Sequence, residues 1–466
     1  MKLKKLSLGV LALALAIGML SGCSVGNKKA DDGKIHIRIG GTPVERTEEN
    51  AAAYDLFQER AQKFMEENPD IVVEADIFSF DLKNYLTKAA AGDLPTMFFT
   101  SPTELRLMSD SGYIKDISEQ AKKYGFYDGY NMEQYKELFT VDGKMYAVAY
   151  GTPSHIGVMY NKKVMKEAGL VDANGAIKYP QTWEELAVTA QTIKEKTGKT
   201  GFYMPTKSNQ GGWLSLNVFW AFGTEFMKQE NNKWVATFAS DEGVAALEYF
   251  KDLKWKYNAI QADVIADING SGKALAANEV GMTINGIGIT TNFVESYELD
   301  IQNIAMSRIP AGPKGRVSQR NASVYVFTGT DEENDACFKW LEFVGQGAKV
   351  TDDMKEQWDR DYKIKHEKGY AVGYGVTDLW VDEERIKAEE EIQQKYRTVD
   401  ESSFADYMSS DGITYRSEPE RCAQQLYSAI DACLQQVFSD ENADCRAILE
   451  KAQKDFQLNY LDKETN

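Results

Sequence analysis

The sequence predicts an α/β protein built as two lobes, each a mainly parallel sheet flanked by helices. Strand and helix patterns alternate over residues 35–104, which is typical of parallel strands covered by helices. Two buried strand patterns, at 145–150 and 156–160, are separated by a short break that begins with Gly151-Thr152-Pro153, and residues of these types end regular structure. Two buried strands joined by one short break suggest a chain that passes from one lobe into another.

The first lobe begins with three strand-like runs separated by two helical patterns. Their order along the chain is 35–39, 56–65, 71–78, 82–89 and 96–100. Period-two alternation marks the strands, and apolar residues at helical spacing mark the helices. Ligands of such sheets sit beyond the carboxyl ends of the strands. The loops predicted to face a ligand are therefore 41–47, 79–83 and 100–103.

The pattern resumes after the break. Further strand-like runs occur at 201–204, 280–284, 304–310 and 323–328. Helices are predicted after the capping-box sequences at 182–185 and 330–333, and the C-terminus returns to amphipathic helices. Residues 378–401 are dense in charge and have few apolar positions, which indicates a solvated helix.

Several motifs carry a family resemblance. Residues 143–146, 150–153, 160–162 and 179–186 resemble the first interlobe crossing of the extracellular solute-binding proteins of family 1, and 280–286 and 323–344 resemble later motifs of that family. These proteins are receptors of ATP-binding-cassette sugar importers. The resemblance implies a two-lobe, type II periplasmic-binding-protein-like fold with a ligand cleft between the lobes, and it is weakest at 350–410.

The expected organisation follows from these patterns. It comprises a lipoprotein signal peptide at 1–22, a flexible tether at 23–34, an N-terminal lobe at 35–150 and 326–350, and a C-terminal lobe at 151–325 and 351–460, with 351–410 as a possible insertion. Hinge segments are expected at 150–152 and 323–325.

The N-terminus predicts a lipid anchor. Three lysines within the first five residues precede an apolar run, 6–20, that is shorter than the ~20 residues of a membrane-spanning helix. Small residues then precede Cys23, as in the bacterial lipobox, in which the cysteine is acylated. The alternative is an ordinary signal peptide with a chance cysteine. The lipoprotein interpretation places a tethered protein on the extracytoplasmic face of the cell membrane.

Charge and cysteine usage restrict the partners. The chain has 466 residues and a formal net charge of -18, which disfavours nucleic-acid binding. No C-x-x-C spacing indicates a zinc site, although Cys433 and Cys445 flank a polar turn and could form a disulfide. A monomer without cofactor or metal is expected.

Catalytic signatures are missing from the sequence. It contains no G-x-S-x-G elbow, no H-E-x-x-H and no complete phosphate loop, and it has only three histidines. Carboxylates are abundant, and a glycosidase needs only two of them, but the sequence identifies no such pair. We therefore expect a binding protein and not an enzyme.

The strand-end loops contain residues suited to a sugar, because aromatic rings cover its C–H face while carboxylates, amides and arginines bind its hydroxyls. Candidates on the first lobe are Thr42, Glu45, Phe80, Asp81, Thr100 and Ser101. The resemblance adds Tyr150, Ser154 and His155 at the crossing, then Asn285 and Gly286, and less directly Tyr415 and Arg416. The family often has an aromatic where this chain has Gly288, so Trp213, in a glycine-rich loop, or Trp380 could supply the stacking platform.

Some candidates have a structural alternative. Phe80 could equally be core, Asp81 could be a helix cap, and Ser101 could contribute only its backbone. Trp220 is expected in the core.

The resemblance and the loops together predict the substrate-binding lipoprotein of an importer. It is expected to bind a carbohydrate, of the oligosaccharide class, and to deliver it to a membrane permease. Two alternatives remain open: a surface-anchored carbohydrate-active enzyme, and the same fold loaded with a peptide or polyamine.

Overall fold

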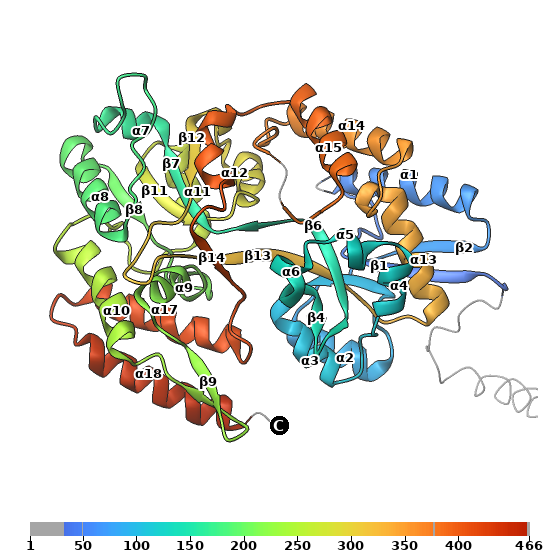
Figure 1. Ribbon diagram of the computed structural model, residues 1–466, viewed down its shortest axis with the longest axis horizontal. Coiled ribbons are helices and arrows are strands. Elements are labelled where there is room, and N and C mark those ends of the chain that lie inside the picture. The colour runs from blue at the N-terminus through green and yellow to red at the C-terminus, as the bar shows by residue number, and fades with distance from the viewer. Residues whose placement is uncertain (1–31, 49, 376–377, 464–466) are drawn as a thin grey trace, which may run out of the picture.

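The computed structural model describes residues 32–48, 50–375 and 378–463. Two lobes lie side by side and are joined by long strands between them (Figure 1). The predicted α/β class is confirmed, since each lobe has a sheet with helices packed on it. The signal segment, Cys23 and most of the tether lie outside the described residues.

The N-terminal lobe begins as the alternation predicts. Its elements are β1 (Ile35–Gly40), α1 (Ala51–Glu67), β2 (Ile71–Asp76), α2 (Leu82–Ala91), β3 (Met97–Thr100), η1 (Pro102–Glu104), α3 (Leu105–Asp110), α4 (Ser118–Lys123), α5 (Phe126–Gly129), α6 (Met132–Phe139), β4 (Thr140–Val141), β5 (Lys144–Met145) and β6 (Ala147–His155). The strand order is β14-β13-β3-β1-β2, with β6 beside β13. β1 runs parallel to β2 and β3, so these strands end at the same edge.

The C-terminal lobe contains the next thirteen elements. They are β7 (Gly157–Asn161), α7 (Lys162–Glu167), α8 (Trp183–Thr197), β8 (Thr200–Tyr203), α9 (Gln210–Phe222), β9 (Met227–Glu230), β10 (Lys233–Ala236), α10 (Asp241–Trp255), α11 (Ile268–Ala276), β11 (Val280–Asn285), α12 (Ile289–Tyr297), η2 (Ile301–Asn303) and β12 (Ile304–Ser307). The remaining elements are β13 (Arg316–Phe327), α13 (Asp331–Leu341), η3 (Glu342–Gln346), α14 (Asp352–Glu367), α15 (Glu383–Lys395), η4 (Glu401–Ser403), α16 (Ala405–Met408), β14 (Ile413–Arg416), α17 (Ala423–Ser439), α18 (Cys445–Asn459) and η5 (Leu461–Lys463).

The strands in the sheet of the C-terminal lobe run in relative directions that differ from the prediction. Its order is β12-β7-β11-β8, and only the β11–β8 pairing is parallel. The expectation of a mainly parallel sheet is therefore wrong for this lobe. β7 enters this sheet directly from the crossing strand β6, and it runs antiparallel to both of its neighbours, β11 and β12.

The crossing strand β6 does not end at Gly151-Thr152-Pro153, contrary to the sequence prediction. It continues to His155 and pairs with β13, Tyr150 lying opposite Ser323 and His155 opposite Arg320. An irregularity in the pairing falls between these positions, and Gly151 adopts a left-handed conformation there (φ 68°). The strand thus absorbs the glycine and the proline as a bulge.

Residues 352–395 differ from their expected place in the C-terminal lobe. α14 and α15 lie beside α1 (Figure 1), and Arg60 of α1 binds Asp361 of α14 at 2.8 Å. Trp380 is buried in the core of the N-terminal lobe. Phe404 and Tyr407 pack instead in an apolar cluster on the C-terminal lobe. The segment 351–410 thus bridges both lobes.

Three further points concern expected features. Cys433 and Cys445 are both free thiols, so the disulfide is not formed. Among the described residues, helices that combine the length and apolar character needed to cross a bilayer do not occur. Nor does that part of the chain contain a cluster of three or more histidine, cysteine or carboxylate side chains placed to hold a metal ion.

Candidate interlobe site

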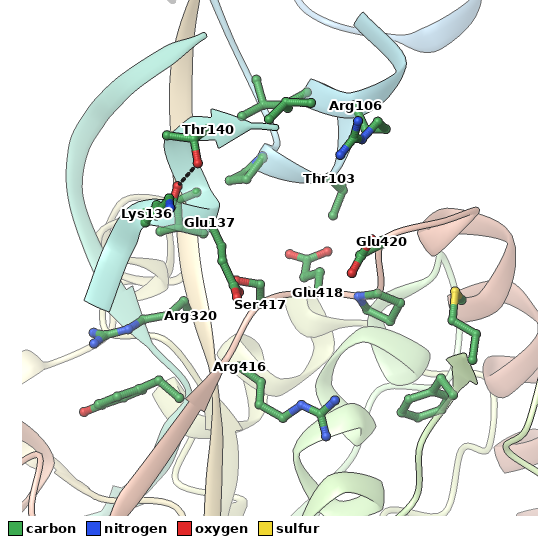
Figure 2. Close-up of a pocket in the computed structure, with 18 of the residues that line it drawn as sticks. Thr103, Arg106, Lys136, Glu137, Thr140, Arg320, Arg416, Ser417, Glu418 and Glu420 are labelled. Carbon is green, nitrogen blue, oxygen red and sulfur yellow. Dashed lines mark hydrogen bonds between the residues drawn. The ribbon is translucent and has the colours of Figure 1, made fainter. Parts of the chain in front are cut away.

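The two lobes enclose a cavity of about 620 Å³, which we call the large cavity. The N-terminal lobe lines it with residues of η1, α3 and α6, and the C-terminal lobe with residues of α9, β9 and the segment 415–420. Figure 2 shows Glu418 and Glu420 pointing into it, between Thr103 and Arg106 on one side and Arg416 on the other. Its volume lies within the range of small-molecule sites.

A second cavity of about 240 Å³, the small cavity, adjoins the large one through Glu418, which lines both. The other residues around it are Ser101, Ser208, Asn209, Gln210, Trp213, Ala322, Gln424 and Tyr427. Ser101 directly follows β3, and Ser208 and Asn209 lie between β8 and α9. The small cavity is therefore placed where the carboxyl ends of strands from both lobes meet, as ligand sites of α/β sheets are.

Trp213 reaches this cavity from a helix and not from the expected glycine-rich loop. Gly211 and Gly212 lie in the first turn of α9, where a Cβ atom on Gly212 would stand 2.1 Å from the Tyr427 carbonyl oxygen. The two glycines thus allow α9 to approach α17 closely, and they do not end the helix. Trp213 is half-buried, and its Nε1–H donates to Glu418 at 3.2 Å.

Glu418 is the polar centre of the two cavities. Besides the Trp213 indole, the Tyr427 hydroxyl donates to its carboxylate. Burial raises the pKa of Glu418, the hydrogen bonds from Tyr427 and Trp213 oppose that shift, and the nearby charge of Glu104 adds to it. Burial also raises the pKa of Glu104 on the other lobe. Glu418 and Glu104, one on each lobe, are thus both largely removed from solvent.

Two predicted residues line the large cavity but have partners of their own. Arg416 donates two hydrogen bonds to Glu225, both 2.8 Å, and its guanidinium lies 4.8 Å from the centre of the Trp220 ring. Trp220 itself is 3% exposed, in agreement with its predicted place in the core. Tyr415 lies against Arg320, a residue that the sequence did not single out.

A pocket of about 100 Å³, the crossing pocket, lies where β6 and β13 pass between the lobes. Ser154, His155, Arg320, Tyr407 and Tyr415 are among the residues that line it. The imidazole of His155 stacks on Tyr407 at 4.3 Å, and His155 Nε2 and Arg320 Nε are buried without a hydrogen-bond partner among the described residues. Burial, aided by the charge of Arg320, lowers the pKa of His155 to about 4, so the ring is neutral at pH 7.

Five other predicted residues lie outside these cavities. Asp81 caps α2 through Asn84 N (3.1 Å), and Phe80 packs on Tyr85. Thr42 donates to the Ile39 carbonyl, Glu45 is exposed, and Thr100 is buried with its hydroxyl unpartnered.

Several candidate residues of the crossing and of the second lobe also lie away from the large and small cavities. Tyr150 stacks on Phe99 at 4.8 Å. Asn285 accepts from the Gly286 amide, and both residues are buried. Trp380 is packed between Tyr130 (4.6 Å) and Arg385 (4.0 Å) and lines a separate 220 Å³ cavity beneath α14 and α15. The structure thus brings together Ser101, Trp213, Tyr415 and Arg416 around the adjoining cavities, and Ser154 and His155 at the crossing.

The residues at the centre of the site are not among those that the sequence patterns predict. Glu418 and Tyr427 come from the segment before α17 and from α17 itself, and Arg320 lies inside a strand. The signal for Glu418 in the sequence is the polar run Tyr-Arg-Ser-Glu-Pro-Glu at 415–420, ahead of an amphipathic helix, of which only Tyr415 and Arg416 are predicted site residues.

Two α/β lobes joined by crossing strands, with a cavity lined from both, define a two-lobe binding protein. Residues 46–346 match the bacterial extracellular solute-binding proteins, and the chain belongs to this family. That match covers most of both lobes and stops before α14.

Solved structures of similar fold agree with this. The cyclic α-maltosyl-1,6-maltose binding protein of Arthrobacter globiformis is 18% identical, with 91% of this chain and 98% of that chain covered and a TM-score of 0.58. The ABC substrate-binding protein of Listeria monocytogenes solved with cycloalternan has 16% identity, coverage of 91% and 99%, and a TM-score of 0.63. The GacH receptor of Streptomyces glaucescens, solved without ligand and with acarbose, has 18% identity, coverage of 92% and 99%, and a TM-score of 0.61. At these identities the likeness concerns the fold.

Proposed function

We propose that this solute-binding protein is the carbohydrate receptor of an ATP-binding-cassette importer. The observation that supports the proposal best is the pair of adjoining cavities between the lobes, which Glu418 joins. Their walls combine aromatic rings, such as Trp213 and Tyr427, with carboxylates, amides and hydroxyls. Rings and polar groups in this mixture suit the C–H faces and hydroxyls of a sugar.

Capture is proposed to occur by closure of the lobes on the sugar. A ligand held by residues of both lobes favours the arrangement in which the lobes approach each other. Tyr150 of β6 pairs with Ser323 of β13, so bending at 150–152 and 323–325 would move the lobes together through adjacent strands.

Cys23 is the proposed site of the lipid anchor, which would hold a monomeric receptor on the extracytoplasmic face of the membrane. The loaded receptor would deliver its sugar to the transmembrane subunits of a permease, and the chain itself would catalyse no reaction. Labelling with a radioactive fatty acid in the producing cell, compared between the native chain and Cys23→Ala, tests the anchor. Loss of label in the variant is expected.

A thermal-shift screen of the purified chain tests the receptor assignment. Glycans of several linkages are compared with amino acids, peptides and polyamines. A ligand at 100 times its Kd stabilises the folded state by about 2.7 kcal/mol. We expect such a rise with at least one glycan, stoichiometric binding by calorimetry, and no cleavage products on chromatography. Turnover of the glycan would favour the enzyme alternative, and a response confined to peptides or polyamines would contradict a carbohydrate ligand.

A further inference from the structure

The basic side chains around the large cavity are mostly neutralised within the protein. Arg106 donates to both oxygens of Asp142 at 2.6 and 2.8 Å, and Arg416 does the same to Glu225. Two lining carboxylates, Asp142 and Glu225, are thus paired with arginines, whereas the hydrogen bonds that reach Glu418 come from the uncharged Trp213 and Tyr427 side chains. The lining as a whole holds five carboxylates and four basic side chains, a formal charge of -1.

Glu418 is the carboxylate for which this matters most, because it is the one shared by both cavities. The donors that reach it are the neutral Trp213 N–H and Tyr427 O–H groups. They supply hydrogen bonds but no compensating charge, and an uncompensated carboxylate is costly away from water. The like charge of Glu104 across the cleft increases that cost.

A second group beside Glu418 also lacks a partner. The Gln319 side chain is fully buried, and neither its amide nitrogen nor its amide oxygen makes a hydrogen bond to the described residues. It lies close enough to Glu418 to lower the pKa of that carboxyl, although not in hydrogen-bonding geometry. A buried amide with unused hydrogen-bonding capacity thus lies next to the carboxylate that both cavities share.

We propose that the solute carries a protonated amine and that the Glu418 carboxylate binds this ammonium group inside the cleft. The proposal rests on the proposed function, since it narrows the ligand to amine-bearing carbohydrates. A sugar hydroxyl offers Glu418 only a dipole, whereas an ammonium offers a full charge and up to three donors.

The test compares matched ligands that differ in the amine. One pair is glucosamine and glucose oligomers of two to four β-1,4-linked units, and the other is acarbose, which has a protonatable bridging nitrogen, and maltotetraose. Calorimetry on the full chain at pH 7.5 measures the Kd of each. We expect the amine-bearing member of at least one pair to bind ten or more times tighter, with an advantage that shrinks as salt is raised.

Two variants test whether Glu418 is responsible for the preference for amine-bearing ligands. Glu418→Gln keeps an acceptor for Trp213 and Tyr427 while removing the charge, and it is expected to abolish the preference for the amine. Glu450→Gln removes an exposed charge of α18, away from the cleft, and is expected to leave the preference intact. The unliganded melting temperature of each variant checks that it is folded.

The outcomes separate this inference from the receptor assignment. Neutral sugars that bind as tightly as their amine counterparts, or a preference that survives Glu418→Gln, would overturn the inference and leave the carbohydrate receptor standing. Failure of all four ligand types to bind, together with a negative glycan screen, would overturn both.

Discussion

The guanidinium of Arg320 lies 3.6 Å from the centre of the Tyr415 ring and 4.2 Å from that of Tyr135. Arg320 belongs to the crossing strand β13, Tyr135 to α6 of the N-terminal lobe, and Tyr415 to β14, which leads into α17 of the C-terminal lobe. Arg320 also donates to the Tyr135 hydroxyl at 2.7 Å. One buried side chain thus contacts both lobes beside the strands that join them.

Arg320→Ala is therefore expected to lower the free energy of unfolding by about 2–4 kcal/mol, because it removes a desolvated cation–π contact and charged hydrogen bonds. Chemical denaturation measures the change. Arg446→Ala, which removes an exposed ion pair with Asp241, should cost only about 0.5 kcal/mol. Equal costs for the two variants would contradict the bridging role of Arg320.

Close packing of α9 against α17 predicts a contrast between two glycines. An alanine Cβ at Gly212 would stand 2.1 Å from the Tyr427 carbonyl oxygen, so Gly212→Ala should destabilise the protein by about 2 kcal/mol or more. Gly288→Ala meets no atom within 4 Å and has helical backbone angles, so it should be neutral or slightly stabilising. The melting temperatures of the two variants measure the difference. A Gly212→Ala protein as stable as Gly288→Ala would show that α9 and α17 are not closely packed at this position.

The buried His155 predicts a loss of stability in acid. Its pKa is about 4 in the folded protein, lower than the usual 6.5, so the unfolded chain binds more protons between these values and stability falls as the pH drops from 6.5 to 4. The shift corresponds to about 3 kcal/mol across that range. His155→Gln should flatten this part of the profile of melting temperature against pH. A variant profile parallel to that of the native chain would mean that His155 titrates normally.

Glu418 predicts the opposite dependence. Because burial raises its pKa in the folded state, the unliganded protein holds this proton more tightly than the unfolded chain does, and that contribution is lost as the pH rises through the raised value. Without ligand, Glu418→Gln should therefore become more stable relative to the native chain from about pH 4.5 upward. Denaturation curves at several pH values measure the difference, and a constant difference would argue against a raised pKa.

Local patterns predicted much of the fold, because the first three strands and two helices have clear periodicity. β14 was missed because its four residues contain little apolar alternation, and its partner β13 lies about a hundred residues away. Local sequence patterns also could not predict that β7 runs antiparallel to its neighbours, since this depends on which strands meet in space. The sequence predicts a possible insertion at 351–410 and a solvated helix at 378–401, but Arg385 and Trp380 bury their side chains together against the N-terminal lobe.

The site was harder to predict than the fold. Trp213 is predicted to lie in a glycine-rich loop, but it lies in α9. The two glycines before it allow close packing of this helix and do not indicate a loop. Glu418 had no local signal of burial; its environment comes from Trp213 and Tyr427, which reach it from separate helices. Asp81, by contrast, showed its capping role in the sequence itself.

Small-angle X-ray scattering on the full chain, with and without the glycan that gives the largest thermal shift, tests the central claim most directly. Closure of two lobes on a shared sugar predicts a smaller radius of gyration and a shorter maximum dimension at saturation. The same glycan added to a binding-deficient Trp213→Ala variant should leave both values unchanged. Saturation of the native chain with no compaction would contradict a cleft that shuts on its solute.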